Sequence, residues 1–259
     1  MTGADRGWAY LRAGRTVEVG VPIGGLSRLL PCHFHDDVQV TFVLAGRYAY
    51  RVGGEIIVAE PGQCVLIPPR LPHAPVMPDL GTTMIVNAYV AEESFGISLG
   101  AACVVDVVGG AWEPAALTER LPEFLPELLP ELLPELQALA AELGAAGRAP
   151  RPSSLMPGTC LPQPLDRLSG SAAVAALAQS CGCSREGFTR RFGREIGMPP
   201  HAYRLMTRLN RARALLRAGD PIAMVAAEAG FADQSHLGRH FRRAFGATPG
   251  AYRNAGLDS

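Results

Sequence analysis

The stretch GFADQSHLGRHFRRAFGATPGAYR, residues 230–253, decides the fold of the C-terminal part of this chain. It opens on a glycine suited to a tight turn, and Asp233 or Ser235 can cap the helix that follows. Within that helix, apolar residues recur at helical spacing and arginines occupy the other faces. Thr248 and Pro249 suit the cap and first turn of a further helix. The stretch therefore predicts a turn, an amphipathic arginine-rich helix and the start of another helix.

The same pattern occurs earlier in the chain, in VAALAQSCGCSREGFTRRFGREIGMPPHAYR, residues 174–204. With an offset of 48 residues before the turn and 49 after it, eleven positions are identical to residues 222–253. Such agreement indicates two copies of one supersecondary unit. The identical pairs are Ala175/Ala223, Ala178/Ala226, Gly182/Gly230, Arg190/Arg239, Phe192/Phe241, Arg194/Arg243, Gly197/Gly246, Pro200/Pro249, Ala202/Ala251, Tyr203/Tyr252 and Arg204/Arg253.

Each copy has the parts of a helix-turn-helix: a short apolar helix, a glycine turn and a second helix rich in arginine. Between the copies, PHAYRLMTRLNRARALLRAG, residues 200–219, predicts one helix of about 18 residues, roughly 27 Å long. This length is close to the spacing of successive major grooves, about 34 Å, so both units can lie on one face of DNA. A plain helical bundle without a ligand is the alternative.

The distribution of charge argues against that alternative. The net charge of the chain is zero, but residues 166–259 hold 14 Arg against 7 acidic residues, whereas residues 1–165 hold 10 Arg and 17 acidic residues. The chain has no lysine, so all of the positive charge is guanidinium, which suits phosphate and guanine. A basic C-terminal part beside an acidic remainder predicts a polyanion partner for the C-terminal part.

Residues 17–90 have a different character, with short β-rich runs separated by turns. Gly46, Gly53-Gly54 and Pro61-Gly62 punctuate these runs at intervals of 7–8 residues, which is typical of an antiparallel sandwich or barrel. An apolar fraction of 48% with 19% charged residues is that of a globular protein, and no stretch has the ~18 apolar residues that a membrane helix needs. We therefore expect no membrane partner. The first residues, MTGADRGWAYLRAGR, are too polar for a signal peptide, so we expect a cytoplasmic location.

A proline repeat and a linker separate these two parts. Prolines at 122, 126, 130 and 134 would each remove a helical hydrogen bond, so a helix is predicted only for residues 135–143. Residues 144–165 are rich in proline and glycine and predict an interdomain linker.

The stretch HFHDDVQ, residues 33–39, places His33, His35 and Gln39 on one face if it is an extended strand. A third histidine, His73, ends the run PGQCVLIPPRLPH. Three readings are open: a pocket for an organic ligand, a metal site, or plain core packing. We find no nucleophile or general base with a partner at telling spacing, so we expect no enzymatic activity.

The C-terminal residues 166–255 resemble the AraC/XylS-type transcriptional regulators, and residues 230–253 look like the signature of that family across its second helix-turn-helix. More loosely, residues 33–73 resemble the cupin-type sensor domain that many members carry. The resemblance implies double-stranded operator DNA, a small-molecule effector and RNA polymerase as partners, with a second copy of the chain as dimer partner. Metal cupins usually have Glu where Gln39 stands, so the resemblance favours an organic effector and no cofactor.

Helical period separates core from contact in the two arginine-rich helices. Phe188, Phe192, Leu237 and Phe241 take the apolar face, and the outward positions match those that face bases in the family's recognition helices. Further arginines look like phosphate contacts, which position the protein without specifying sequence. The predicted base contacts are Arg185, Glu186, Thr189, Arg190, Gln234, Ser235, His236 and Arg239, and the predicted phosphate contacts are Arg194, Arg208, Arg242 and Arg243.

The predicted fold is a two-domain α+β protein, with an N-terminal cupin-like β-barrel followed by an all-α module of two helix-turn-helix units. Residues 1–112 would sense the effector through His33, His35, Gln39 and His73, which would also be the ligands of any bound metal. Residues 113–143 would carry the dimer contact, residues 144–165 the linker, and residues 166–255 the DNA-binding domain. The rival prediction is a cupin metalloenzyme or metal sensor fused to a DNA-binding tail.

Overall fold

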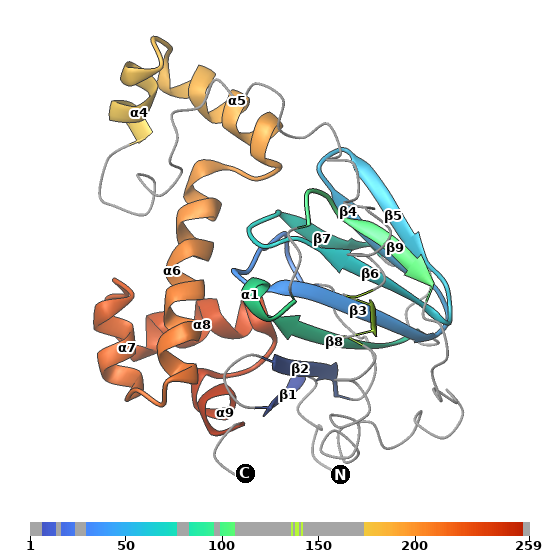
Figure 1. Ribbon diagram of the computed structural model, residues 1–259. Helices are drawn as coiled ribbons and strands as arrows, with labels where there is room; N and C mark the ends of the chain where they lie inside the picture. The colour runs from blue at the N-terminus through green and yellow to red at the C-terminus, as the bar shows by residue number, and fades with distance from the viewer. Residues whose placement is uncertain are drawn as a thin grey trace, which may run out of the picture.

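The computed structural model describes residues 7–13, 17–23, 30–76, 83–95, 99–106 and 174–255, together with positions 136, 138, 139 and 141. A β-rich part and a helical part lie side by side, with one long helix facing the β-rich part (Figure 1). Nearly all of the proline repeat and the whole predicted linker, residues 144–165, lie outside the described residues. Among the described residues, no helix has the length and apolar character to span a membrane.

The N-terminal part is an antiparallel β-sandwich, as the turn spacing predicts. Its larger sheet has the strand order β1-β2-β8-β3-β6-β9, and its smaller sheet has the order β5-β4-β7. The described strands thus form two sheets rather than one closed barrel. The strands are β1 (Trp8–Ala13), β2 (Val17–Pro22), β3 (Val38–Ala45), β4 (Tyr48–Val52), β5 (Glu55–Ala59), β6 (Gln63–Ile67), β7 (His73–Val76), β8 (Met84–Val90) and β9 (Cys103–Asp106), and a short helix α1 (Glu92–Phe95) follows β8.

Strand β3 is buried on both faces, and its two faces differ in chemistry. Val38, Val40 and Phe42 pack in an apolar cluster that also contains Leu136 and Leu139. Those two leucines are helical, in agreement with the helix predicted for residues 135–143. On the other face, Gln39 and Thr41 point into the sandwich interior, where both contact Tyr50 of the smaller sheet. A polar interior face is unusual for a central strand and marks a candidate site.

The C-terminal part consists of two helix-turn-helix units joined by α6. Helices α4 (Val174–Ser180) and α5 (Arg185–Ile196) form the first unit, and α7 (Ile222–Glu228) and α8 (Gln234–Phe245) form the second. Helix α6 (Pro200–Arg217) has the predicted 18 residues, and α9 (Pro249–Asn254) follows α8. Ser184 caps α5, and Asp233 rather than Ser235 caps α8, through an oxygen 2.7 Å from the His236 amide nitrogen. The duplication predicted from sequence is confirmed.

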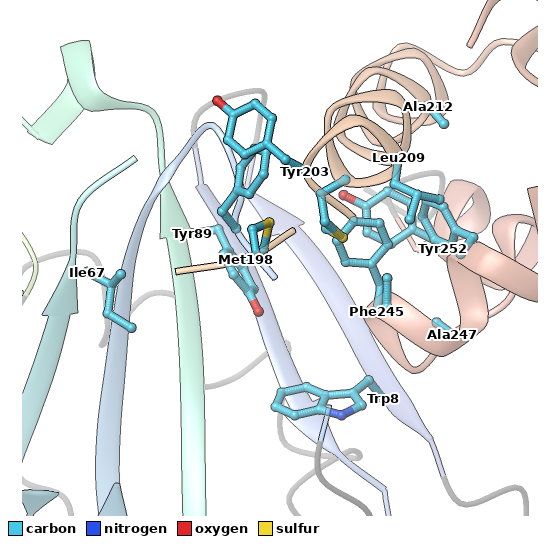
Figure 2. Packing of buried hydrophobic residues seen from close by; sticks show 14 of the residues in the cluster. Trp8, Ile67, Tyr89, Met198, Tyr203, Leu209, Ala212, Phe245, Ala247 and Tyr252 are labelled. Carbon is cyan, nitrogen blue, oxygen red and sulfur yellow. The ribbon is translucent and has the colours of Figure 1, made fainter. Parts of the chain in front are cut away.

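One hydrophobic cluster continues from the sandwich interior into the helices. Trp8 and Tyr89 from the sheet side and Phe245 and Tyr252 from the helix side all belong to this cluster (Figure 2). The backbone nitrogen of Trp8 donates to the Gly246 oxygen at 3.2 Å, and the Tyr10 hydroxyl donates to the Phe245 oxygen at 2.6 Å. The two parts are therefore docked through a shared core rather than through scattered surface contacts.

Candidate nucleic-acid interface and histidine cluster

Helices α5 and α8 each bury the predicted apolar face and expose residues on their other faces. Phe188 and Phe192 are buried in α5, and Leu237 and Phe241 are buried in α8. The predicted contact residues divide by accessibility. Arg185, Glu186, Arg190, Arg194, Gln234, Ser235, Arg239, Arg242 and Arg243 are exposed, while Thr189, Arg208 and His236 are half-buried.

The three half-buried residues have partners within the protein. The Thr189 hydroxyl donates to the Arg185 backbone oxygen at 2.9 Å. The ring of His236 packs 5.5 Å from that of Phe231, measured between centroids. Arg208 donates from Nε to the Ala229 oxygen at 3.0 Å, and its guanidinium lies 4.3 Å from the centroid of Phe231. Arg208 therefore holds the turn of the second unit against α6.

The four polar residues predicted for the effector pocket lie together in the sandwich interior. His33, His35, Gln39 and His73 are all at most 4% exposed. The local structure differs from the predicted strand, because β3 begins only at Val38 and the two histidines precede it. His33 is held instead by a pair of backbone hydrogen bonds with His73, each 2.9 Å long. This pairing brings histidines forty residues apart into ring contact, at a centroid distance of 4.4 Å.

Each histidine is oriented in the same way by the backbone. The Nδ1 atoms of His33, His35 and His73 each lie 2.8 Å from a carbonyl oxygen, belonging to Pro31, Asp37 and Leu71 respectively. A carbonyl can only accept, so each Nδ1 carries a proton and each neutral ring presents an Nε2 lone pair. One ligand atom from each histidine can be chosen so that all three lie within 4.8 Å of one another.

Burial keeps these rings neutral. It lowers the pKa of His33 from 6.5 to about 4 and that of His35 to about 3, and it lowers the pKa of His73 well below its ordinary value. The nearby charge of Arg213 further lowers the pKa of His35. The Nε2 lone pairs are therefore available at neutral pH, which is the state that a metal ion requires.

Gln39 closes the cluster. Its Oε1 lies 2.6 Å from Nε2 of His35 and 3.2 Å from Nε2 of His73. Its Nε2 donates to the Tyr50 hydroxyl at 2.6 Å and to the Thr41 hydroxyl at 2.9 Å. In this arrangement three acceptor atoms face one another, and a cation between them would stabilise it. Rotation of the amide would instead let its NH₂ group donate to both imidazoles.

The donor set fits a divalent transition metal. Three neutral imidazoles and one amide oxygen suit ions such as Zn²⁺, Ni²⁺ or Cu²⁺, whereas Mg²⁺ and Ca²⁺ prefer sets of charged and neutral oxygens. The carbonyl bonds to Nδ1 supply the outer support that metal-binding histidines normally have. The residues that would hold such an ion are His33, His35 and His73, with Gln39 beside them.

Sequence reasoning missed the residues that extend this cluster. The Thr41 hydroxyl donates to Asn87 Oδ1 at 2.8 Å, and the ring of His35 lies 5.1 Å from that of Tyr89. A signal was present in VQVTFV, residues 38–43, because two polar residues alternate with apolar ones in a strand buried on both faces. Asn87 and Tyr89 alternate in the same way on β8, the neighbouring strand.

Comparisons with known proteins match both parts. A helix-turn-helix domain family matches residues 177–255, and a cupin domain family matches residues 18–89. The HTH-type transcriptional regulator MtrA of Neisseria gonorrhoeae is 29% identical over 100 residues, which are 38% of this chain and 33% of that protein. The probable transcriptional regulator LumQ of Photobacterium leiognathi is 32% identical over 87 residues, which are 33% of this chain and 35% of that protein. The chain thus spans about a third of the length of these curated relatives.

The overall fold also has a solved counterpart. The structure of ToxT from Vibrio cholerae with an unsaturated fatty acid bound matches with a TM-score of 0.51 at 10% identity, over 96% of this chain and 94% of that chain. At this identity the likeness concerns the fold alone. It agrees with the two-domain order predicted from sequence, in which a cupin-like β domain precedes the helical DNA-binding module.

Proposed function

We propose that this chain is an AraC-type regulator of transcription under the control of a ligand, with a cupin domain ahead of the DNA-binding module. Both helix-turn-helix units would read one operator, and a small ligand in the cupin domain would change that binding. We further propose RNA polymerase and a second copy of the chain as partners, and the cytoplasm as the compartment. Nearly all of the predicted dimer segment, residues 113–143, lies outside the described residues.

The observation that carries the DNA-reading function is the duplicated exposed arginine face. Arg190 of α5 and Arg239 of α8 occupy equivalent positions in the two units, and both are exposed. The same is true of Arg194 and Arg243. An exposed guanidinium on a recognition helix can bond to guanine O6 and N7, and its neighbours can bind phosphate. Selection of bound duplexes from a random pool by the full chain tests this function.

The ligand is proposed to act at the histidine cluster, and its chemical class is the next question. An organic effector is one candidate, as the resemblance implies. A divalent metal is the second, and the uniform Nδ1–carbonyl bonds together with the Gln39 oxygen beside two Nε2 atoms favour it. A bound metal would supply a positive charge and fix the four side chains, and the residues would act as sensor rather than catalyst. The rival, a cupin metalloenzyme with a DNA-binding tail, would require turnover of a substrate.

Zinc binding distinguishes the two ligand classes. If the cluster is a metal site, the purified full chain should bind one equivalent of Zn²⁺ by isothermal titration, and the double variant His35→Ala with His73→Ala should lose it. Zinc should change the DNA affinity of the wild type and leave that of the double variant unchanged, because the variant lacks the contacts through which the ligand acts. His201→Ala, which changes an exposed histidine on α6, is the matched control and should bind zinc as wild type does. Absence of stoichiometric zinc in the wild type would leave the organic effector as the ligand.

A further inference from the structure

The histidine cluster and the DNA-binding module share one short piece of chain, residues His33–Asp37, which we name the coupling segment. Two of its members, His33 and His35, line the cluster. Two other members, Phe34 and Asp37, contact α6, the helix that joins the two helix-turn-helix units. Each α6 residue involved lies more than 165 positions away in the sequence.

Phe34 fixes the middle of the coupling segment to α6. Asn210 donates from Nδ2 to the Phe34 backbone oxygen at 3.0 Å, and both groups are buried. The Phe34 ring, 2% exposed, lies 4.7 Å from the ring of Tyr203, measured between centroids. Because Phe34 stands between the two histidines in the chain, its backbone cannot move without moving them.

Asp37 connects the cluster to α6 within a single residue. Its backbone oxygen accepts the Nδ1 proton of His35 at 2.8 Å. Its carboxylate accepts two hydrogen bonds from Arg217, at 3.1 Å and 2.6 Å, in the bidentate arrangement that arginine favours. A change in the position of the His35 ring therefore acts on the residue that anchors the C-terminal end of α6.

A second set of contacts runs in parallel. The ring of His35 meets the ring of Tyr89 edge-on at 5.1 Å. The guanidinium of Arg213 lies 4.3 Å from the centroid of Tyr89, and Arg213 also forms a buried ion pair with Glu18. Both routes leave from His35 and end on α6, one turn apart.

We propose that the coupling segment transmits the state of the histidine cluster to α6, and through α6 to the relative placement of the two recognition helices. This inference rests on the proposed ligand-sensing function. The contacts of α6 hold the segment in the position where the three imidazoles converge, so docking of α6 and binding at the cluster favour each other. By linkage, docking and ligand binding strengthen each other by the same factor, so a change that lowers the population of the docked state lowers the affinity for the ligand.

Zinc, used alone as the probe, tests this reciprocity. Arg217→Gln alters α6 at a residue that touches no histidine, and the full-length variant should bind Zn²⁺ at least about fivefold more weakly than wild type. Arg211→Gln, an exposed arginine on the same helix, is the matched control and should leave zinc affinity unchanged. If Arg217→Gln fails to fold, Asp37→Asn tests the same pair from the other side. Wild-type zinc affinity in a folded Arg217→Gln variant would overturn the inference.

A second measurement needs no ligand and separates this inference from the proposed function. His35→Ala in the full chain should speed hydrogen exchange of the α6 amides, because the ring that supports Asp37 and Tyr89 is gone. Glu60→Gln, which breaks an exposed ion pair of the sandwich, should not. If the wild-type protein binds no zinc, the cluster is not a zinc site. The exchange result then decides whether the coupling segment transmits the state of the cluster to α6. Unchanged hydrogen exchange of the α6 amides in a folded His35→Ala variant would reject this transmission.

Discussion

Replacing Glu18 by glutamine is expected to destabilise the protein by about 3–5 kcal/mol, the usual result of removing one partner from a buried ionic network. Glu18 is 2% exposed and lies where β2 meets the helices. The neutral amide would leave the buried guanidinium of Arg213 without its nearest counter-charge. The side chains that donate to the Glu18 carboxylate are Arg12, Arg213, Arg217 and Tyr252.

The stability of the protein should also depend on pH through Glu18. Burial alone would raise the pKa of Glu18, but Arg213 and Arg217 lower it from 4.5 to about 2. A carboxyl with a lowered pKa in the folded state stabilises the fold above its unfolded value. The contribution of Glu18 is therefore complete above about pH 4.5 and is lost as the pH falls towards 2. In Glu18→Gln this part of the acid dependence should be missing.

Urea unfolding followed by tryptophan fluorescence measures both effects, since Trp8 packs across the domain interface. The control is Glu60→Gln, whose partner Arg47 lies 2.7 Å away in an exposed ion pair. Exposed pairs contribute about 0–1 kcal/mol, so this variant should unfold nearly as wild type does. Equal stability of the Glu18 and Glu60 variants would contradict the view that the buried network holds the two domains together.

Arg239→Ala and Arg243→Ala are expected to weaken DNA binding in different ways. Arg239 lies on the exposed face of α8, where its guanidinium can bond to a base edge, so its loss should cost about 1–3 kcal/mol at one base position and relax preference there. Arg243 would contact phosphate. Its loss should weaken binding to all sequences alike and reduce the slope of log K against log salt by about one.

Fluorescence anisotropy with single-base variants of a bound duplex, repeated over a salt series, separates the two classes. Arg208→Ala is an informative comparison, because Arg208 holds the Ala229 carbonyl and the Phe231 ring. Its loss should lower thermal stability of the second unit as well as DNA affinity. Wild-type preference and affinity in both Arg239→Ala and Arg243→Ala would mean that α8 presents another face to DNA.

The helical part of this protein could be predicted almost entirely from sequence, because its signals are local. The glycines at 182 and 230, the caps Ser184 and Asp233 and the apolar spacing in α5 and α8 all lie within a few residues of the structure they specify. Of the two predicted caps for α8, sequence could not choose between Asp233 and Ser235, since both side chains can accept a backbone hydrogen bond. The 18-residue length of α6 followed from its unbroken helical pattern.

The residues of the candidate site could be predicted from sequence, but the backbone geometry that brings them together could not. His33, His35, Gln39 and His73 converge as expected, but through a backbone pairing of His33 with His73 rather than through one extended strand. The interdomain network was missed, because Glu18 and Arg213 are 195 residues apart and neither lies in a recurring local pattern. Only the docking of α6 on the sandwich brings them together.

The most direct test of the account is the set of duplexes that the full chain selects from a random pool at physiological salt. The account predicts a motif with two conserved elements centred about one helical turn, 10–10.5 base pairs, apart, because α6 joins two recognition helices that read successive major grooves. Arg190→Ala and Arg239→Ala should each blur one element and leave the other. Selection of a single element that only one of these variants alters, or no enrichment over the starting pool, would contradict the claim that both units read one operator.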